Sequence, residues 1–423
     1  MTEILTSLTM LCLLVPVYVY FGYPVLLWTL TLWRPRRTHR VGLIEPSVSL
    51  IVSCYNEAGV IREKLDNASA LDYPSEKLEI IVVSDGSDDG TDDIVKEYAA
   101  QGVRLIRQEG RLGKTMGLNL ALEAATGEIV VFSDANAMYA ADALRMLVRN
   151  FADEGVGYVV GAALYTDGRE GASAQNENLY WRYELAIKSM ESRLHSVVGG
   201  DGAIYAIRRE LWEPLQQRDI NDFVNPLQIV AKGYRGIFEP EAKCFEETAG
   251  SFDKEIARKE RIVNRSIRGL MRVKSVMNPL TVGIFAVEVI SHKLLRWLIP
   301  LFLLVGVGGS TLLAARALWP FQVITAGALV LTVLAFQGQR AGDKQDLPVW
   351  ISVPYYFVMV NLYAVKGIAK AARGETQVTW SSARPVSHGG LMIDNNGSRE
   401  SVNRWWLLLI LFFVLGLGIG YVC

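Results

Sequence analysis

The chain has 423 residues, of which 51% are hydrophobic, and its formal net charge at pH 7 is −1. This near-neutral balance gives no support for broad nucleic-acid binding, so we expect no nucleic acid among its partners. The charges are unevenly distributed, because residues 41–275 are rich in charges of both signs whereas both ends carry long uncharged apolar stretches. This division predicts an integral membrane protein with a water-exposed domain.

The first apolar run extends from Ile4 to Trp33 without a charged residue, more than enough for a helix that crosses a hydrocarbon core of about 30 Å. A cleaved signal peptide is the alternative, but the run exceeds a signal h-region and lacks a positive n-region. Four arginines follow, at positions 34, 36, 37 and 40. The positive-inside rule then predicts that the water-exposed domain lies in the cytoplasm and that the chain is a multi-pass protein of the inner or plasma membrane.

Residues 41–277 alternate apolar, β-branched runs with helical patterns. We expect strands at residues 47–53, 78–84, 103–108, 128–133, 158–164 and 235–240, and helices at residues 60–71, 91–100, 115–125, 141–151, 175–194, 223–232 and 254–274. Strands and helices that alternate at these lengths predict parallel βαβ units, hence an α/β domain with its site at the carboxyl ends of the strands.

The predicted organisation is this α/β domain inserted between transmembrane helices. Its parts are an N-terminal span with its basic flank (1–40), the α/β domain (41–277), an interfacial helix (278–296), transmembrane segments (297–373), a polar loop (374–404) and a C-terminal span (405–423). Three spans after the domain would put Lys366, Lys370 and Arg373 outside, against the positive-inside rule. One re-entrant or interfacial segment would remove the conflict and would bring Thr379-Trp380 to the cytosolic side.

Two predicted strands end on carboxylates. Asp85 follows the strand at 78–84, and Asp134 with Asn136 follows the strand at 128–133. Neighbouring buried strands that end in this way make a plausible crevice for a nucleotide. An acid followed two residues later by an amide oxygen suits a divalent cation that bridges a diphosphate. The structural alternatives are a turn residue for Asp85 and a helix cap for Asp134.

Five arginines of the helix at 254–274 are spaced three and four residues apart, so they share one face: Arg258, Arg261, Arg265, Arg268 and Arg272. A cationic face of this kind fits anionic lipid headgroups. The earlier arginines fit a substrate phosphate instead. Both interpretations hold if the helix runs down to the membrane.

In chain order the sequence offers the motifs VSLIVSCYNE, IIVVSDGSDDGT, EGRLGKTMGLNLAL, IVVFSDANA, VVGGDGAIYAIRRE and IND. This series, over about residues 47–275, resembles the membrane-embedded family-2 glycosyltransferases, which include cellulose, chitin, hyaluronan and poly-N-acetylglucosamine synthases. The resemblance implies a GT-A fold, a UDP-sugar donor, Mg²⁺ or Mn²⁺ as cofactor and inversion at the anomeric carbon. It also implies a lipid or glycan acceptor at the membrane and leaves room for export-complex subunits as partners.

On the donor side, the resemblance implies that Asp85 holds the uridine, with Tyr55 and Glu57 as further nucleotide-sugar contacts. Lys114 would meet the nucleotide or its phosphates; the alternative is a lysine that merely starts a helix. Asp134 would contact the nucleotide sugar and, together with Asn136, would hold the metal as the family's Asp-x-Asp does. Asn136 keeps an oxygen ligand but loses a charge.

On the acceptor side, the resemblance implies that Asp222 is the general base that takes a hydroxyl proton, with a helix N-cap as the alternative. The loop Gly200-Asp201-Gly202 would shape the acceptor site. The family's Gln-x-x-Arg-Trp corresponds to residues 258–262, so Arg261 would meet the leaving diphosphate and Arg258 would contact the acceptor. Ile262 stands where the family has the Trp that stacks on a sugar ring.

The exchange of that Trp for Ile262 weakens the case for long processive synthesis. Transfer of one or a few sugars, processive β-polysaccharide synthesis, and a non-catalytic nucleotide-binding subunit of an exopolysaccharide complex all remain open from the sequence. Tyr180, Trp181 and Tyr183 are alternative sugar-stacking residues, although packing of their helix against the sheet is the commoner use of such side chains. The motifs specify neither the sugar nor the acceptor.

Overall fold

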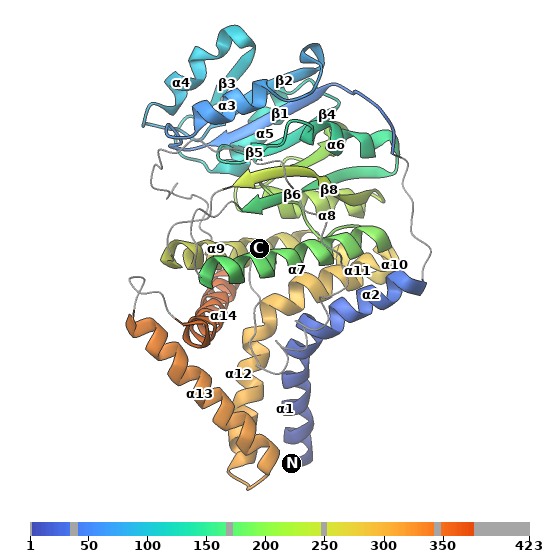
Figure 1. Cartoon of the computed structure of the whole chain (residues 1–423). Helices are drawn as coiled ribbons and strands as arrows, with labels where there is room; N and C mark the ends of the chain where they lie inside the picture. Colours follow the sequence, from blue (N-terminus) through green and yellow to red (C-terminus); the bar gives the residue numbers. More distant parts are fainter. Residues whose placement is uncertain (1, 34–40, 166–171, 247–251, 342–347, 376–423) are drawn as a thin grey trace.

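The computed structural model describes residues 2–33, 41–165, 172–246, 252–341 and 348–375 (Figure 1). Within these ranges, the side chains of residues 165, 172–181, 252–259 and 341 are not described. The predicted basic flank, the C-terminal span at 405–423 and nearly all of the predicted polar loop therefore lie outside the described residues.

A single mixed sheet of eight strands forms the centre of the domain, in the order β3-β2-β1-β4-β7-β6-β8-β5. The strands are β1 Val48–Cys54, β2 Leu78–Ser84, β3 Val103–Arg107, β4 Ile129–Asp134, β5 Met138–Tyr139, β6 Val156–Tyr165, β7 Tyr205–Arg208 and β8 Arg235–Glu246. Strands β1 to β4 pair in parallel, and β7 runs antiparallel to both of its neighbours. The predicted α/β class is confirmed, although the half beyond β4 is more mixed than simple βαβ units.

Helices cover both faces of this sheet. Those of the α/β domain are α3 Ile61–Ser69, α4 Thr91–Glu97, α5 Lys114–Ala124, α6 Ala143–Val148, α7 Ala172–Leu194, α8 Asn221–Ala231 and α9 Phe252–Arg272. Alternate residues of β1 point to opposite faces, so Leu50 joins a core with α3, α4 and α6, while Ile51 joins a core with α5 and α8. Strand β1 is buried along its whole length, which explains why most of its residues are apolar.

Strand β8 is longer than the sequence pattern predicts. The predicted strand ends at Pro240, but β8 continues to Glu246 and pairs there with β5 and the end of β6. The register against β6 shifts between Val160 and Ala162, opposite the stretch that contains Pro240. A proline is tolerated at such an irregularity because its missing N–H leaves no ladder bond unmade there. This extension brings Glu246 close to the strand end that carries Asp134.

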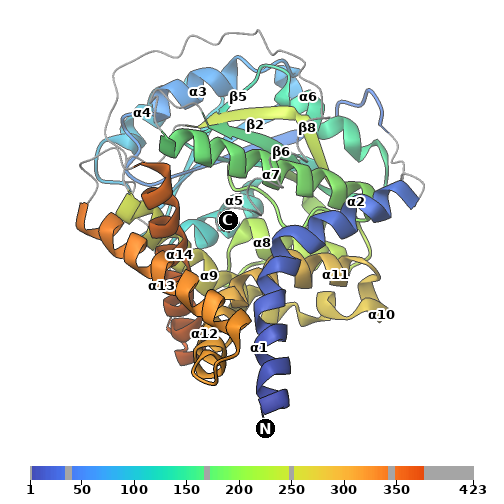
Figure 2. The same ribbon diagram turned by 60° about the horizontal axis from the view of Figure 1, so that its bottom comes forward.

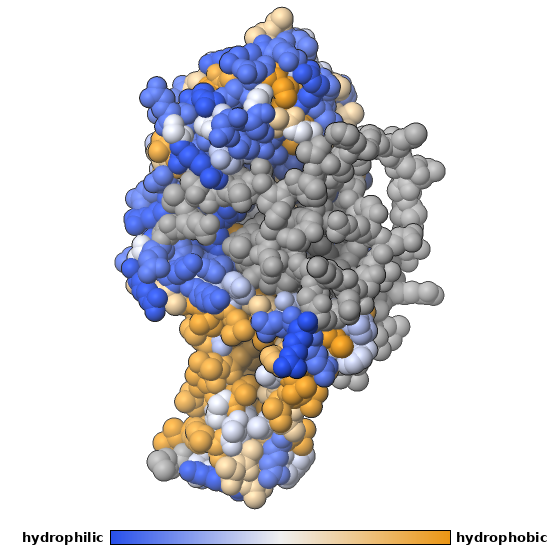
Figure 3. Space-filling view, turned by 90° about the vertical axis from the view of Figure 1, so that its left-hand side faces the viewer, coloured by the Kyte–Doolittle hydropathy of each residue, from blue (hydrophilic) through white to orange (hydrophobic). Residues whose placement is uncertain are grey.

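The remaining helices form an apolar stalk below the domain (Figure 3). They are α1 Thr2–Val17, α2 Tyr23–Trp33, α10 Pro279–Val282, α11 Phe285–Val289, α12 Leu295–Ala314, α13 Trp319–Ala341 and α14 Val349–Arg373. Four rods are long and apolar enough to cross a membrane, at Thr2–Trp33, Phe285–Ala314, Trp319–Arg340 and Val349–Arg373. These features indicate a membrane-associated protein.

The first and second rods pack through small residues. A Cβ at Gly309 would lie 2.1 Å from Thr9 Oγ1, and one at Gly306 would lie 2.9 Å from a side-chain carbon of Leu13. Close approach of this kind is how helices associate in lipid, where there is no hydrophobic drive between them. The second rod also begins at Phe285, so the predicted boundary at residue 296 falls inside a continuous helix.

Helix α14 lies against the α/β domain. Asn264 of α9 donates a hydrogen bond to the backbone oxygen of Gly367 over 3.3 Å, and Lys370 pairs with Glu260 at 2.5 Å. The opposite end of α14 meets the end of α13, where a Cβ at Gly338 would lie 2.6 Å from Tyr355. Figure 2 shows α14 beside both α9 and α13. The basic end of α14 is therefore held at the domain.

Candidate active site

The carboxyl ends of β1, β2 and β4 are level with one another. In the parallel registers Cys54 faces Ser84, and Ser53 faces Asp134. The chain builds β2 and β3 on one side of β1 and then crosses to β4 on the other side, which makes this edge a topological switch point. Open α/β sheets bind ligands at such points. Asp85 and Asp134 therefore share one edge of the sheet, as the sequence predicts.

Asp85 is held rigidly from one side. Its Oδ1 accepts hydrogen bonds from Gln108 Nε2 at 2.8 Å and from the backbone N–H groups of Leu112 and Gly113 at 2.9 and 2.8 Å. Its Oδ2 is buried and has no hydrogen-bond partner within the described part of the chain. Burial raises the pKa of Asp85, while the two backbone N–H groups and Arg111 oppose the rise. A fixed carboxylate with one open acceptor is built to receive a donor from a ligand.

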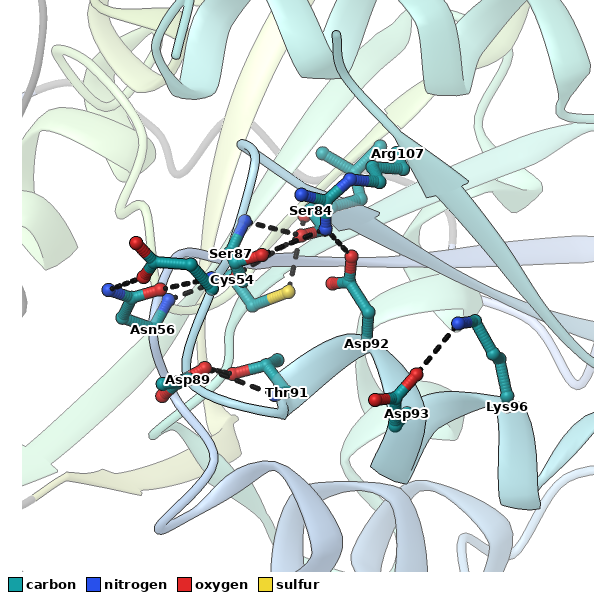
Figure 4. Close-up of polar contacts among 12 residues, drawn as sticks. Cys54, Asn56, Ser84, Ser87, Asp89, Thr91, Asp92, Asp93, Lys96 and Arg107 are labelled. Carbon is teal, nitrogen blue, oxygen red and sulfur yellow. Dashed lines mark hydrogen bonds and ion pairs between the residues drawn. The ribbon is translucent and has the colours of Figure 1, made fainter. Parts of the chain in front are cut away.

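The turns that follow β1 and β2 are locked together (Figure 4). Asn56 has a positive φ of 53°, and its side chain exchanges two hydrogen bonds with Asp88, at 2.7 and 3.0 Å. The backbone N–H of Glu57 donates to Thr91 Oγ1 at 2.9 Å. Tyr55 lies beneath Arg111, whose guanidinium carbon is 3.8 Å from the centre of the Tyr55 ring. The predicted Tyr55 and Glu57 therefore flank Asp85 on an ordered pair of turns.

Lys114, Asp134 and Asp222 converge on Gly202. Lys114 starts α5, and its Nζ pairs with Asp134 Oδ1. A Cβ placed on Gly202 would lie 3.2 Å from Asp222 Oδ2, 3.4 Å from Lys114 Nζ and 3.7 Å from Asp134 Oδ2. Residues far apart in the sequence are thus gathered within a few ångströms. A side chain at position 202 would fill the space between them.

Asp222 is not a helix cap. Helix α8 begins at Asn221, its N-cap is Ile220, and no side chain caps it. Asp222 Oδ1 is buried and makes no hydrogen bond to the described residues. Burial raises the pKa of Asp222; the positive charge of Lys114 opposes this, and the negative charges of Asp201 and Asp134 add to it. The carboxylate is therefore a better proton acceptor than an ordinary aspartate.

The oxygen donors around Asp134 fit a hard divalent cation. Asn136 donates from Nδ2 to Glu246 Oε1 at 3.0 Å, which turns its amide oxygen the other way. Asp134, Asp201 and Asp222 lie close enough for the charges of the first two to contribute to the raised pKa of Asp222. Among the described residues no three His, Cys, Asp or Glu side chains form a complete metal site. A site with few protein ligands is what Mg²⁺ or Mn²⁺ uses when phosphate oxygens supply the rest.

The loop Gly200-Asp201-Gly202 is fixed at both sides. The backbone N–H of Gly200 donates to the backbone oxygen of Asp222, and a Cβ at Gly200 would lie 3.0 Å from that oxygen. Asp201 Oδ2 pairs with Lys188 of α7 at 3.2 Å. The loop predicted to shape the acceptor site therefore lies directly against Asp222.

The arginines of α9 do not form a single lipid-facing or phosphate-facing stripe. Arg265 is 8% exposed and donates to the backbone oxygens of Gln217, Arg218 and Asp219, and to Thr115 Oγ1. Arg272 pairs with the Asp219 side chain. These two arginines clamp the loop before α8, so for them both interpretations from the sequence are wrong. The reason is that the loop presents several carbonyl oxygens that need buried donors.

The remaining predicted residues lie on helices α7 and α9. Arg261 is half-buried on α9, one turn from Arg265 on the same face. The side chains of Arg258, Tyr180 and Trp181 lie outside the described ones. The Tyr183 hydroxyl donates to the backbone oxygen of Tyr20 at 3.0 Å, so Tyr183 packs against the first membrane rod.

Lys64 is a site residue that sequence reasoning misses. Its side chain is fully buried beneath the turn after Asp134, donates to the backbone oxygen of Ala137, and lies 4.1 Å from the centre of the Tyr139 ring. Burial lowers the pKa of Lys64 to about 8. In the sequence it stands among charged helix residues and looks exposed. Only the pairing of β5 with β8 closes the space around it.

Comparison with known proteins decides the family. Residues 49–214 match the sequence profile of the family described as Glycosyl transferase family 2. These residues are a family 2 glycosyltransferase domain. The match includes Asp85, Lys114, Asp134 and the Gly200–Gly202 loop, whereas Asp222 lies beyond it. The resemblance expected from the sequence is confirmed.

Two relatives of the family 2 domain are informative. The β-monoglucosyldiacylglycerol synthase of Trichormus variabilis is 30% identical over 166 residues, which are 38% of this chain and 34% of that protein. The poly-β-1,6-N-acetyl-D-glucosamine synthase of Staphylococcus aureus is 33% identical over 117 residues, 27% and 28% of the two chains. This chain thus spans about a third of the length of these curated relatives.

The fold of a solved enzyme extends further along the chain. The mannosyltransferase PcManGT of Pyrobaculum calidifontis, in complex with GDP-Man and Mn²⁺, superposes with a TM-score of 0.66 at 25% identity. The superposition covers 86% of this chain and 99% of that one. It confirms the predicted GT-A-like fold and shows that a neighbour of this fold binds a nucleotide sugar and a divalent metal.

Replacement of Arg265 by Met should destabilise the α/β domain by about 2–4 kcal/mol, because the carbonyl oxygens of Gln217 and Arg218 lose the donor that Arg265 supplies. Arg62, whose side chain is 52% exposed, is the matched control. Its replacement by Met should change stability by less than about 0.5 kcal/mol. Thermal unfolding of both variants in the same detergent measures the difference, and equal melting temperatures would contradict the clamp.

Ionised Asp222 should make the fold less stable. Its raised pKa means that the protonated form is favoured in the folded state, so no penalty exists below the unfolded value of about 3.9. The penalty develops as the pH rises through the folded value. Asp222→Asn should therefore melt at a higher temperature than the parent at pH 7, and the gap should close toward pH 4. Asp93→Asn, at a carboxyl group that is 80% exposed, should show neither effect.

Proposed function

We propose that this chain is a membrane-bound inverting glycosyltransferase that moves a sugar from a UDP-sugar to a lipid or growing glycan acceptor at the membrane. The observation that carries the proposal is the convergence of Lys114, Asp134 and Asp222 around Gly202, where Asp222 Oδ1 has no hydrogen-bond partner among the described residues. The family 2 domain and the GDP-mannose complex of PcManGT support a nucleotide-sugar donor.

The donor would lie across the strand ends of β1, β2 and β4. The open Oδ2 of Asp85 would accept an N–H from the nucleobase, which is the donor that a uracil ring offers to a carboxylate. Tyr55 and Arg111 present a flat stack beside it, on which the base can rest. Lys114 would turn from Asp134 to the diphosphate and balance part of its charge.

In the transfer step, the acceptor hydroxyl oxygen attacks the anomeric carbon of the sugar from the side of Asp222. The bond from that carbon to the diphosphate oxygen breaks, and the nucleoside diphosphate leaves with the electron pair. Asp222 takes the hydroxyl proton, for which its raised pKa suits it. Attack opposite the leaving group inverts the centre, so an α-linked donor gives a β-linked product. Arg261 would stabilise the departing diphosphate.

Asp134 and Asn136 would hold a divalent cation, Mg²⁺ or Mn²⁺, with Glu246 orienting Asn136. When bound, such a cation neutralises charge on the diphosphate and makes it a better leaving group. The proximity of Asp134 to the carboxylates of Asp201 and Asp222 supports the assignment, because a bound cation would offset their mutual repulsion.

Two kinds of acceptor remain compatible with this site. Ile262 offers no aromatic face for a sugar ring. Transfer of one or a few sugars to a lipid is therefore favoured, and the relative named β-monoglucosyldiacylglycerol synthase supports that choice. A processive β-polysaccharide synthase is the second candidate, supported by the relative named poly-β-1,6-N-acetyl-D-glucosamine synthase. Two measurements separate the candidates. Transfer of one or a few sugars to diacylglycerol in vesicles would support the lipid acceptor, and a long polymer made by membranes would support the processive synthase.

We further infer that α14 lies along the domain side of the membrane and that this side is cytoplasmic. Its two ends meet α13 and α9, and its basic residues Lys366, Lys370 and Arg373 would then lie on the same side as the domain, as the positive-inside rule requires. This arrangement removes the conflict that arises when α14 is counted as a full span.

Asp222→Asn should lower the release of UDP from UDP-sugars by about 10²–10⁴-fold, because the amide cannot accept the hydroxyl proton. Membranes that contain the full chain would be supplied with Mn²⁺ and a panel of UDP-sugars and GDP-mannose. UDP affinity should change less than about threefold, since Asp85 and Lys114 are untouched. Undiminished turnover in the variant would reject Asp222 as the base, and binding without turnover in the parent would favour the non-catalytic subunit.

Lys366→Cys tests the orientation of α14. In a background without native cysteines, inverted membrane vesicles should react with a membrane-impermeant maleimide at position 366, as they should at an exposed domain position such as Arg62→Cys. Intact cells should protect both positions. Labelling of position 366 from the opposite side to position 62 would show that α14 crosses the membrane.

A further inference from the structure

The α/β domain meets the membrane rods at a buried cluster of charges on α7. Glu184 and Glu191 lie two turns apart on the same face of that helix, and both are almost completely buried, at 1% and 0% exposure. Burial alone would raise the pKa of Glu184, but the charges of Arg296 and His292 hold it well below its usual range. The cluster therefore keeps the Glu184 carboxylate ionised inside the junction.

Both membrane rods reach these two carboxylates. Tyr23 of α2 donates its hydroxyl to Glu191 Oε1 over 2.6 Å. The ring of His292 lies between the acids, with Nδ1 at 2.6 Å from Glu191 Oε1 and Nε2 at 3.0 Å from Glu184 Oε2. Figure 2 shows α2 alongside α7.

The two rods are also built irregularly at this level. Each contains one π-turn, at Tyr18–Gly22 and at Ile290–Leu294, and the Tyr18 hydroxyl is 2.8 Å from Ser291 Oγ. A π-turn re-aims side chains and is frequent at functional sites. Here the turns bring Tyr23 and His292 to the same carboxylate of Glu191.

Glu191 also holds the loop that contains Gly200 and Gly202. Its second oxygen, Oε2, accepts the backbone N–H of Val198 at 3.1 Å, where that loop begins. One turn earlier on α7, Lys188 holds Asp201. The far side of the loop contacts Asp222 through Gly200. One carboxylate thus touches the membrane rods with one oxygen and the loop with the other.

We propose that Glu191 is a positioning residue through which the membrane rods hold the Val198–Gly202 loop in place against Asp222. Its consequence for sugar transfer rests on the proposed function, but the structural link does not. The donor-side residues Asp85, Lys114 and Asp134 lie at the ends of β2 and β4 and at the start of α5, and their hydrogen bonds and ion pairs go to residues other than Glu191. Loss of the link should therefore impair use of a membrane acceptor and leave nucleotide binding unchanged.

Hydrogen exchange of the full chain in lipid nanodiscs tests the link directly. Tyr23→Phe removes one donor to Glu191 and preserves the ring, and Glu191→Gln leaves a single acceptor oxygen where two are used. Exchange in a peptide that contains Val198 should be about threefold to tenfold faster in both variants. Tyr18→Phe is the matched control: it loses a hydroxyl contact in the same rod that does not touch Glu191, and its exchange should equal that of the parent.

Unchanged exchange at Val198 in Tyr23→Phe, or an equal change in Tyr18→Phe, would overturn the proposal even if Glu191→Gln fails to fold. In a second measurement, the affinity for UDP with Mn²⁺ should be the same in Tyr23→Phe and the parent, while UDP release that depends on added membrane acceptor should fall several-fold. A parent that turns over no nucleotide sugar would reject the proposed function, and the exchange measurement would still decide the role of Glu191.

Discussion

The site depends on one electrostatic constraint: three carboxylates share a small volume, and the lysines around them must balance their charge. Asp134 and Asp222 approach the same point beside Gly202, with Asp201 close enough to add to their repulsion. Lys114 is the cation placed among them. Such a site lowers the stability of the ligand-free protein. It is complementary to a metal cation together with a diphosphate, which would draw Lys114 away from Asp134. Gly202 makes the convergence geometrically feasible because a larger residue would occupy the meeting point.

The sheet supplies the rigidity that this constraint needs. Repulsion between acids would open a loose site, but Asp85 is held by two backbone N–H groups and Gln108, and Arg265 fixes the loop before α8 with several hydrogen bonds. Lys64 supports the turn after Asp134 from below. Buried polar groups that several hydrogen bonds hold in this way keep functional side chains at defined positions.

The membrane part is structurally continuous with this site. Glu191 joins Tyr23 and His292 of the rods to the loop beside Asp222, and α14 packs along α9. A transferase that takes its acceptor from a lipid bilayer benefits from this continuity, because the height of the site above the bilayer is then fixed by buried bonds and not by a flexible linker.

The sequence by itself determined the α/β class, the strand ends that carry Asp85 and Asp134, and the apolar rods, because these depend on local periodicity and on motif order. It also pointed to Asp222, while leaving a helix cap as an alternative. Only the tertiary structure decided that Asp222 is not a cap, that Arg265 clamps a loop, that Lys64 is buried, and that Glu191 links the rods to the loop. These facts depend on contacts between residues tens to more than a hundred positions apart, and such contacts leave no periodic trace along the chain.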